Sequence, residues 1–261
     1  MSPSFAEIAP RYDALRPLSA GDRRRLEKML REAALKADDL VVEVGCGTGR
    51  LTLAVSPMTP GRLVGVDSEA RMLDVARSKD TGGRVEWVRG SAYRLPLDEG
   101  AAALVMMVMV VHLLRQRVRA FTEAGRVLRL GGQLSIWTFT PRHVEEFYLN
   151  AYFPSIAVID RPRFPSAEVL SAELRRAGFD DVRVDLVEEP RRLDIADVVD
   201  RVRGRYISTL AMLPPLEYRL GLQQLEEMLA RDLSIRLTQR SEWAIITARS
   251  GPSARHASPP K

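Results

Sequence analysis

The stretch VVEVGCGTGRLTLAV, residues 41–55, places three glycines and a cysteine directly after a short apolar run. Gly45, Gly47 and Gly49 alternate with single residues, and the chain then continues into a segment that favours a helix. Because glycine lacks a Cβ, a turn of this kind lets the backbone come closer to a ligand than a side chain would allow. The stretch therefore predicts a buried strand, a ligand-binding turn and a helix.

The spacing of the glycines limits the kind of ligand. Dinucleotide-binding turns follow the pattern G-x-G-x-x-G, whereas this turn reads G-x-G-x-G. A triphosphate-binding loop needs a lysine and then Ser or Thr after its last glycine, and the chain has Arg50 and Leu51 there. S-adenosylmethionine remains as a common ligand of such turns, and a tight turn without any ligand stays open as the alternative.

Length and composition are those of one α/β domain with room for an added cap. The chain has 261 residues, of which 46% are apolar and 28% charged. The longest apolar run, residues 101–114, is shorter than the ~18 to 20 residues of a membrane-spanning helix, so we expect a buried strand and no membrane association. The first residues do not resemble a secretory signal, which favours a cytoplasmic protein. The single cysteine, Cys46, excludes an internal disulfide and a thiolate metal cluster, and we expect no metal.

The net charge of +5 raises the question of a nucleic-acid partner. The basic residues are almost all arginines, and Asp and Glu are interspersed with them, as in residues 172–185 and 194–205. This pattern is typical of solvated helix faces, so it favours a small-molecule partner over nucleic acid. The sequence does not indicate an oligomeric state.

Short β-branched runs alternate with amphipathic stretches between residues 22 and 138, which is typical of a parallel sheet flanked by helices. A helix expected at 115–130 should end in a turn at Gly131 and Gly132. About forty largely helical residues are expected before the last strand. The prediction is an α/β fold, a doubly wound, mostly parallel, Rossmann-like sheet of seven strands, at 40–44, 62–67, 84–90, 102–109, 133–139, 181–187 and 242–249.

Polar groups follow several strand ends that should meet at one crevice. Asp67 ends the second strand about twenty residues after the glycines, where a carboxylate can accept hydrogen bonds from a ribose. The third strand leads into the stretch VRGSAYRLPL, residues 88–97. Open α/β sheets bind ligands at the carboxyl ends of their strands, so three neighbouring ends point to one ligand site.

Residues 10–140 resemble the class I S-adenosylmethionine-dependent methyltransferases, in the small-molecule branch that includes ubiquinone and menaquinone biosynthesis enzymes. The resemblance rests on VVEVGCGTGRLT, VGVDSEARMLDVAR, VRGSAYRLPL, the strand ending in VVHLL, and EAGRVLRLGGQLSIWTF, in this order. It implies S-adenosyl-L-methionine as cofactor and says little about the methyl acceptor. The chain departs from the family at Ser91, where an Asp is usual, and at Ala102 and Ala103, where Phe-Asp is common.

The resemblance also implies which residues surround the cofactor. Glu43 would face its ammonium group, Asp67 its ribose, and Ser68 and Met72 its adenine. In the stretch RYDALRP, residues 11–17, Tyr12 would close over the cofactor and Arg16 would meet its carboxylate; an ordinary surface arm is the alternative. The full expected set is Tyr12, Arg16, Glu43, Gly45, Cys46, Gly47, Gly49, Asp67, Ser68, Met72, Gly90, Ser91, Ala92 and Met107.

Histidines and aromatic residues supply the candidates for catalysis and acceptor binding. His112 follows the fourth strand and is the candidate general base, with a polar contact or a helix cap as alternatives. Cys46 has no activating base in the sequence and is expected to fill space. The acceptor is expected to contact His143, Phe147, Tyr148, Tyr152, Arg201, Arg205 and Tyr206. The last three could meet an anionic or phenolic acceptor, and an amphipathic cap helix with a solvated arginine face is the alternative.

These residues divide the chain into a lid arm at 1–21, a methyltransferase domain at 22–250 with cap segments at about 141–165 and 194–231, and a disordered tail at 251–261. The expected function is methyl transfer to O, N or C of a small, largely apolar or aromatic acceptor. An RNA or protein methyltransferase is the first alternative. A non-catalytic module that binds S-adenosylmethionine is the second.

Overall fold

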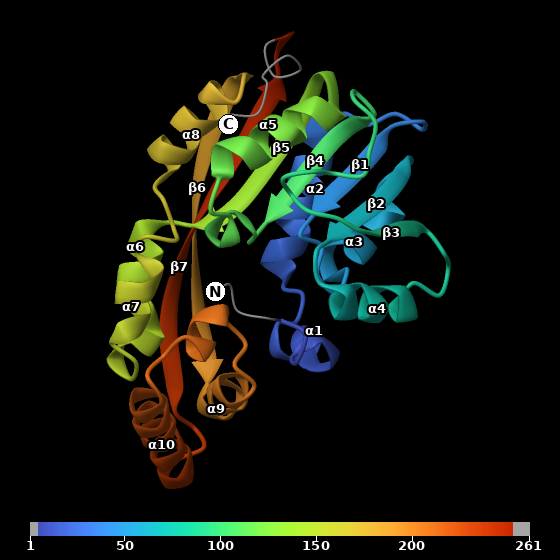
Figure 1. The fold of residues 1–261 in the computed structure, drawn as a ribbon. Helices are drawn as coiled ribbons and strands as arrows, with labels where there is room; N and C mark the ends of the chain where they lie inside the picture. The colour runs from blue at the N-terminus through green and yellow to red at the C-terminus, as the bar shows by residue number, and fades with distance from the viewer. Residues whose placement is uncertain (1–4, 253–261) are drawn as a thin grey trace.

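A computed structural model describes residues 5–252, and the chain forms one sheet of seven strands in the order β3-β2-β1-β4-β5-β7-β6 (Figure 1). The first five strands run parallel, and β7 pairs antiparallel with both β5 and β6. The expected seven-stranded, mostly parallel fold is therefore confirmed. The strands are β1 (Leu40–Val44), β2 (Arg62–Asp67), β3 (Val85–Arg89), β4 (Ala102–Val108), β5 (Leu128–Phe139), β6 (Phe179–Asp194) and β7 (Arg236–Ser250).

Helices cover both faces of this sheet. Leucines and valines of α2 (Ala20–Ala33) and α3 (Arg50–Val55) form one apolar core with β1, β4 and β5. The opposite core joins the same strands to α5 (Arg117–Val127) and α8 (Ala167–Arg176). The central strand β1 is buried along its whole length because it has a helical layer on each side. A further helix, α4 (Ala70–Lys79), follows β2 and contacts β2 and β3.

The transition from α5 to β5 differs from the prediction. The helix ends at Val127, and β5 begins at once and runs through Gly131 and Gly132, so these glycines do not end the helix. Gly131 has φ +71°, and the pairing of β4 with β5 shifts register between Ala102 and Leu104. A glycine in this conformation inside a strand is typical of a bulge.

Strands β6 and β7 are much longer than predicted. They pair from Phe179 opposite Ser250 to Asp194 opposite Arg236, and so extend well past the other strands (Figure 1). The region between them was predicted to hold about forty largely helical residues. This prediction is confirmed, because the region holds α9 (Ile195–Arg203), a 3-10 turn η5 (Ser208–Ala211) and α10 (Pro215–Arg231).

A third apolar core lies at the far end of this long hairpin. It joins α9, η5 and α10 to α7 (Ser155–Asp160) and η4 (Tyr148–Ala151), which follow α6 (Pro141–Glu145). Leu15 of the short helix α1 (Tyr12–Leu15), which follows the 3-10 turn η1 (Ala9–Arg11), also packs into this core. We call these elements of residues 141–160 and 195–231 the cap.

Two smaller expectations concern the ends and the surface of the chain. Only Gly251 and Pro252 of the tail predicted at 251–261 are described, so the expected disorder lies outside the described residues. Between residues 5 and 252, no helix combines the length and the hydropathy needed to cross a membrane.

Candidate active site

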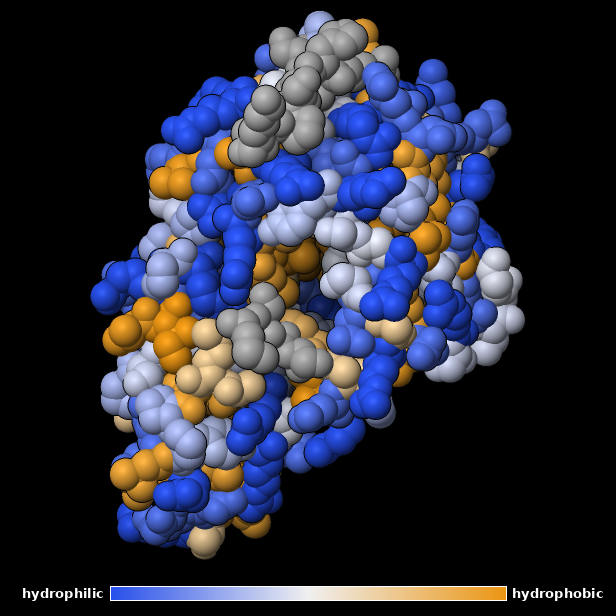
Figure 2. Space-filling model, in the orientation of Figure 1, coloured by the Kyte–Doolittle hydropathy of each residue, from blue (hydrophilic) through white to orange (hydrophobic). Residues whose placement is uncertain are grey.

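A cavity of about 640 Å³ lies at the carboxyl ends of the parallel strands, between the sheet, the N-terminal arm and the cap. Its mouth is visible as a hollow with apolar residues on its floor (Figure 2). Its lining comes from the turn after β1, the ends of β2, β3 and β4, helix α1, and the cap. Ligand pockets commonly measure about 300 to 1,000 Å³, so this one has room for a cofactor and a small molecule together.

The three glycines of the turn serve different purposes. All have positive φ, of 74° at Gly45, 56° at Gly47 and 71° at Gly49. A Cβ on Gly45 would lie 2.4 Å from Val110, and one on Gly49 would lie 2.3 Å from the ring of Trp87. A Cβ on Gly47 would meet nothing within 4 Å, because Gly47 borders the cavity. The expected close approach to a ligand thus applies to Gly47, whereas Gly45 and Gly49 make room for protein side chains.

Asp67 connects the end of β2 to the glycine turn. Its Oδ2 accepts a hydrogen bond from the Gly47 N–H at 2.8 Å, and its Oδ1 accepts one from the Glu69 N–H at 2.8 Å. Burial raises the pKa of Asp67, and these backbone donors act in the opposite direction. Each carboxylate oxygen has two lone pairs, so both can accept a further hydrogen bond from a ligand hydroxyl.

Glu43 lies in β1, directly below the turn. Its side chain is 3% exposed, lines the cavity and accepts a hydrogen bond from the Thr52 hydroxyl. Burial raises the pKa of Glu43 from 4.5 to about 7. A buried carboxylate with one hydroxyl donor is stabilised by a nearby cation, and the ammonium group of S-adenosylmethionine is a cation of suitable size.

Cys46 is a buried, unreactive thiol. It is 6% exposed, and burial, together with the charges of Glu43 and Asp67, raises the pKa of its thiol far above the ordinary value. The thiolate is the nucleophilic form of cysteine. The geometry therefore supports the space-filling role and gives no support to nucleophilic catalysis.

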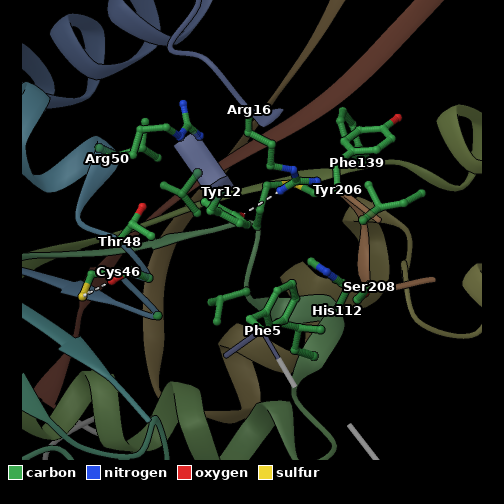
Figure 3. A pocket seen from close by; sticks show the side chains of 18 of the residues that line it. Phe5, Tyr12, Arg16, Cys46, Thr48, Arg50, His112, Phe139, Tyr206 and Ser208 are labelled. Atoms are coloured by element: carbon green, nitrogen blue, oxygen red, sulfur yellow. Dashed lines mark hydrogen bonds between the residues drawn. The ribbon is translucent and has the colours of Figure 1, made fainter. Parts of the chain in front are cut away.

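The N-terminal arm lies across the cavity and touches both the sheet and the cap. Asp13 accepts hydrogen bonds from the Thr48 hydroxyl of the glycine turn and from the Lys79 ammonium of α4. The Arg16 guanidinium donates to the Tyr12 hydroxyl at 3.0 Å and lies 5.9 Å from the ring centroid of Tyr206 in the cap. Figure 3 shows Arg16 extending into the cavity between these two tyrosines.

His112 lies at the end of the crevice that follows β4. Its ring stacks on Phe164 with 4.5 Å between centroids, and its Nδ1 is buried without a hydrogen-bond partner in the described part of the chain. Burial, with the positive charges of Arg163 and Arg16, holds its pKa well below the ordinary value. The imidazole is therefore uncharged at neutral pH and is a weak base.

Aromatic rings form the wall of the cavity beside the cap. His143 stacks on Phe139 with 3.7 Å between centroids, and Trp243 contacts the same Phe139 at 4.1 Å. Phe147 links His143 to Tyr148, with centroid distances of 5.5 Å and 5.0 Å. Burial lowers the pKa of His143 to about 3, so this ring is also uncharged. We call Phe139, His143, Phe147, Tyr148 and Trp243 the aromatic wall.

Most of the predicted site residues line this one cavity. They are Tyr12, Arg16, Glu43, Gly45, Cys46, Gly47, Asp67, Ser68, Met72, Gly90, Ser91, Ala92, His112, His143, Phe147, Tyr148, Arg201 and Tyr206. Their roles toward a ligand remain predictions.

Four predicted site residues do not line the cavity. Gly49 faces Trp87, and Met107 is fully buried in the core between the sheet and α5. The Tyr152 hydroxyl contacts the Met228 sulfur at 3.2 Å inside the cap, and the Arg205 guanidinium lies over the Tyr218 ring. For Met107 and Tyr152 the reason is packing, because each points into an apolar core. Arg205 is turned away by its backbone, which has φ +48°.

Other cavity residues were missed by the sequence reasoning. Met109, just after β4, lines the cavity in place of Met107, and its φ of +54° marks the end of the strand. Phe164, Gln239, Ser241 and Trp243 also line it. Phe164 lies in the cap segment expected at about 141–165. The three residues of β7 carry no local signal, because only the long hairpin brings them to the site.

This strand order, with an antiparallel β7 inserted beside β5 and a glycine turn and an acidic residue ending β1 and β2, defines a class I S-adenosylmethionine-dependent methyltransferase. The chain belongs to this family. Residues 41–132 match the family model of the methyltransferase domain. Its curated relatives include the ubiquinone/menaquinone biosynthesis C-methyltransferase UbiE of Geobacter sp. (strain M21), 30% identical over 69% of this chain and 87% of the relative.

A second relative and two solved structures agree with this assignment. The demethylmenaquinone methyltransferase of Thermus thermophilus is 32% identical over 70% of this chain and 94% of its own. The YcgJ protein of Bacillus subtilis has the same fold, with a TM-score of 0.63, 18% identity and coverage of 87% of this chain and 98% of its own. Phosphoethanolamine N-methyltransferase 2 of Haemonchus contortus, solved with S-adenosylhomocysteine, has a TM-score of 0.59, 16% identity and coverage of 93% and 57%.

The chain is thus an S-adenosylmethionine-dependent methyltransferase that acts on a small molecule. The cavity fits that cofactor, because the open space at Gly47 and the free lone pairs of Asp67 lie together at the sheet edge. Glu43 adds an anion beside the same space. These residues could hold the methionine and ribose parts of the cofactor.

Proposed function

We propose that the chain transfers a methyl group to a small, largely apolar or aromatic organic acceptor bound between the aromatic wall and the cofactor. The observation that carries the proposal is that a single cavity joins Gly47 and Asp67 at one end to Phe139, His143 and Phe147 at the other. Stacked rings favour a flat, apolar ligand over a large polar one. The printed names of the curated relatives concern quinone biosynthesis, which supports a ring-shaped acceptor.

The residues at the sheet edge have the task of placing the cofactor. Gly47 leaves its backbone open to the ligand, Asp67 accepts hydrogen bonds from the ribose, and Glu43 neutralises the ammonium group. When bound, S-adenosylmethionine supplies a strongly electrophilic methyl group. The remaining work of the chain is to hold the acceptor in line with it, which lowers the entropic part of the barrier.

His112 orients the acceptor in this proposal. Both stacking on Phe164 and the low pKa argue for an uncharged imidazole that exchanges a hydrogen bond with the acceptor. Its Nδ1 has no partner in the described part of the chain, so this nitrogen is available to a ligand. A strong general base would instead need a pKa near neutrality, which typically comes from a carboxylate partner.

The test is calorimetry with S-adenosylhomocysteine, followed by a methyl-transfer screen with S-adenosylmethionine and panels of aromatic, aliphatic and RNA acceptors. We expect binding of the cofactor product and turnover that is confined to small aromatic or apolar acceptors. Cofactor binding without turnover on any panel would favour the non-catalytic module. Turnover on RNA with a steep salt dependence would favour the nucleic-acid alternative.

A further inference from the structure

The charged residues on the wall of the cavity are unevenly distributed. Within residues 5–252, Glu43 and Asp67 at the sheet edge form no ion pair, and the nearby Arg50, whose charge acts on Glu43, is itself paired with Asp22. Two other acids of the wall are already paired: Asp22 with Arg25, 2.8 Å apart, and Asp160 with Arg163, 2.7 Å apart. The acidic end of the cavity is therefore the end that faces the glycine turn.

The part of the wall that faces the arm and the cap is basic. Two partly buried guanidinium groups of the wall, Arg16 and Arg201, have no carboxylate partner within residues 5–252. Arg16 contacts the hydroxyl of Tyr12 and lies beside the ring of Tyr206. Holding a guanidinium away from water without an anion is costly, so two such groups in one cavity indicate a binding role for an anionic ligand.

Two tyrosine hydroxyl groups lie within the influence of the Arg201 charge. The hydroxyls of Tyr148 and Tyr206 are 3.2 Å apart, and both residues line the cavity. Burial raises the pKa of both tyrosines, and the positive charge of Arg201 acts on both in the opposite direction. Both hydroxyls therefore stay protonated. One of the two protons forms the bond between them, and the other can be donated to a ligand beside a positive charge.

The two arginines share Tyr206 as a neighbour but differ at Tyr148, on which the charge of Arg201 acts. Arg16 belongs to the arm that is anchored on the glycine turn through Asp13 and Thr48, so it is the one placed for the cofactor carboxylate. Arg201 belongs to α9 of the cap. Tyr148, on which its charge acts, contacts Phe147 and is part of the aromatic wall. A second anion would thus lie next to the rings and not next to the cofactor.

We propose that Arg201 and the hydroxyls of Tyr148 and Tyr206 form an anion subsite, and that the methyl acceptor is an aromatic compound bearing a carboxylate or a phosphate. This inference rests on the proposed function and deepens it by naming the charge of the acceptor. The ring lies along the aromatic wall while the anionic group reaches the subsite. Guanidinium and phenol groups donate hydrogen bonds equally well to a carboxylate and to a phosphate. Experiment must therefore decide which of the two groups the acceptor carries.

The experiment titrates the full chain, saturated with S-adenosylhomocysteine, by calorimetry. The probes are 4-hydroxybenzoate, its neutral counterpart 4-hydroxybenzamide, and phenyl phosphate. We expect the better of the two anions to bind about 10- to 100-fold more tightly than the amide, as for hydrogen bonds to charged groups. A preference for benzoate or for phenyl phosphate identifies the oxyanion.

Three variants make the assignment specific. Arg201→Met should abolish the preference for the anion and leave amide binding unchanged, whereas Arg201→Lys should keep part of it. Arg205→Met is the matched control, because Arg205 is four residues away but lies over Tyr218 and outside the cavity. It should leave every affinity unchanged. Binding of S-adenosylhomocysteine to each variant shows that the fold is retained.

Two results would overturn the subsite. One is an unchanged preference in Arg201→Met, and the other is a loaded protein that binds neither anion more tightly than the amide. Methyl transfer to a neutral aromatic compound with no dependence on Arg201 would leave the proposed function standing while the anion subsite fails. Absence of turnover on all acceptors would instead count against the proposed function.

Discussion

At Gly47, the backbone conformation and the neighbouring space make two separate demands on the residue. A methyl group there would occupy the cavity, and the φ of +56° would strain any L residue. Gly83 has φ +58° and equally open space but does not line the cavity. Substitutions at Gly47 and Gly83 therefore separate the effect of backbone strain from the effect of filling the ligand cavity.

We expect Gly47→Ala and Gly83→Ala each to lower the free energy of unfolding by about 1 to 2 kcal/mol through backbone strain. Only Gly47→Ala should weaken S-adenosylhomocysteine binding, by a factor of about 5 to 150, as for overpacking of a filled site. Chemical unfolding and calorimetry on both variants measure the two effects. Equal affinities in the two variants would remove Gly47 from the ligand site.

Glu43 should make the stability of the ligand-free protein depend on pH. Its pKa is about 7 in the folded protein and 4.5 when exposed, so between these values the folded state holds a proton that the unfolded state has lost. Stability should therefore fall as pH rises from 4.5 to 7, by up to about 3 kcal/mol, and stay level above.

The variant Glu43→Gln should lack this dependence. Urea unfolding at pH 5 and pH 7.5 measures the free energy of unfolding of both proteins. Between these pH values the wild type should lose stability relative to the variant. Glu86→Gln, at an exposed position of β3, is the control and should show no such change. A pH-independent difference for Glu43→Gln would show that the carboxylate ionises normally.

Single residues also show what the sequence could and could not predict about the site. Asp67 and the glycines carry their signal locally, because strand ends and backbone turns are set by neighbouring residues. The predicted set contains Met107 and not Met109, since an apolar run gives no sign of where a strand ends. Gln239, Ser241 and Trp243 reach the cavity only through the pairing of β7 with β5 and β6, which is a tertiary contact.

Among the elements, the arm of residues 9–16 is the one that closes the cavity over the glycine turn. Its anchor is Asp13, which accepts hydrogen bonds from Thr48 and Lys79, whereas its outer contact between Arg11 and Asp200 is more than 60% exposed on both sides. Partly buried, shared carboxylates hold a segment better than exposed pairs. The arm should thus depend on Asp13 and hardly on Arg11.

We expect Asp13→Ala to raise the dissociation rate of S-adenosylhomocysteine by about 2- to 5-fold, since a partly exposed ion pair contributes up to about 1 kcal/mol. Arg11→Ala should leave that rate unchanged. Stopped-flow displacement measures both variants. Equal rates in Asp13→Ala and wild type would mean that the arm does not retain the ligand.

The lengths of β6 and β7 show the limits of prediction for whole elements. The stretch EEPRRLD, residues 188–194, is charged and contains Pro190, which argues against a strand in general. In the fold it belongs to an edge strand with solvent on one side, where proline and charge are tolerated. The parallel strands were predicted well because burial on both faces leaves a plain apolar run.

For the whole molecule, the cavity is formed by three parts that meet at one place: the sheet, the arm and the cap. A ligand that contacts all three should stabilise the folded state as a unit. At a concentration 100 times its dissociation constant, S-adenosylhomocysteine should add about 2.7 kcal/mol to the free energy of unfolding.

For a chain of this size the corresponding rise in Tm is about 5 to 10 °C. Differential scanning calorimetry with and without the ligand measures it, and Gly47→Ala should show a much smaller rise at the same concentration. An unchanged Tm of the wild type in the presence of the ligand would contradict the assignment of the cavity as the cofactor site.

The long hairpin of β6 and β7 also has a consequence for how such an enzyme can change its substrate. Residues 195–235 leave and re-enter the sheet at Asp194 and Arg236, which are opposite each other in the ladder. The two ends of the insertion are thus already adjacent, and its exchange for another sequence leaves every parallel strand untouched. The insertion can therefore be replaced as one unit, which changes the acceptor that is bound, while the residues that bind the methyl donor stay the same.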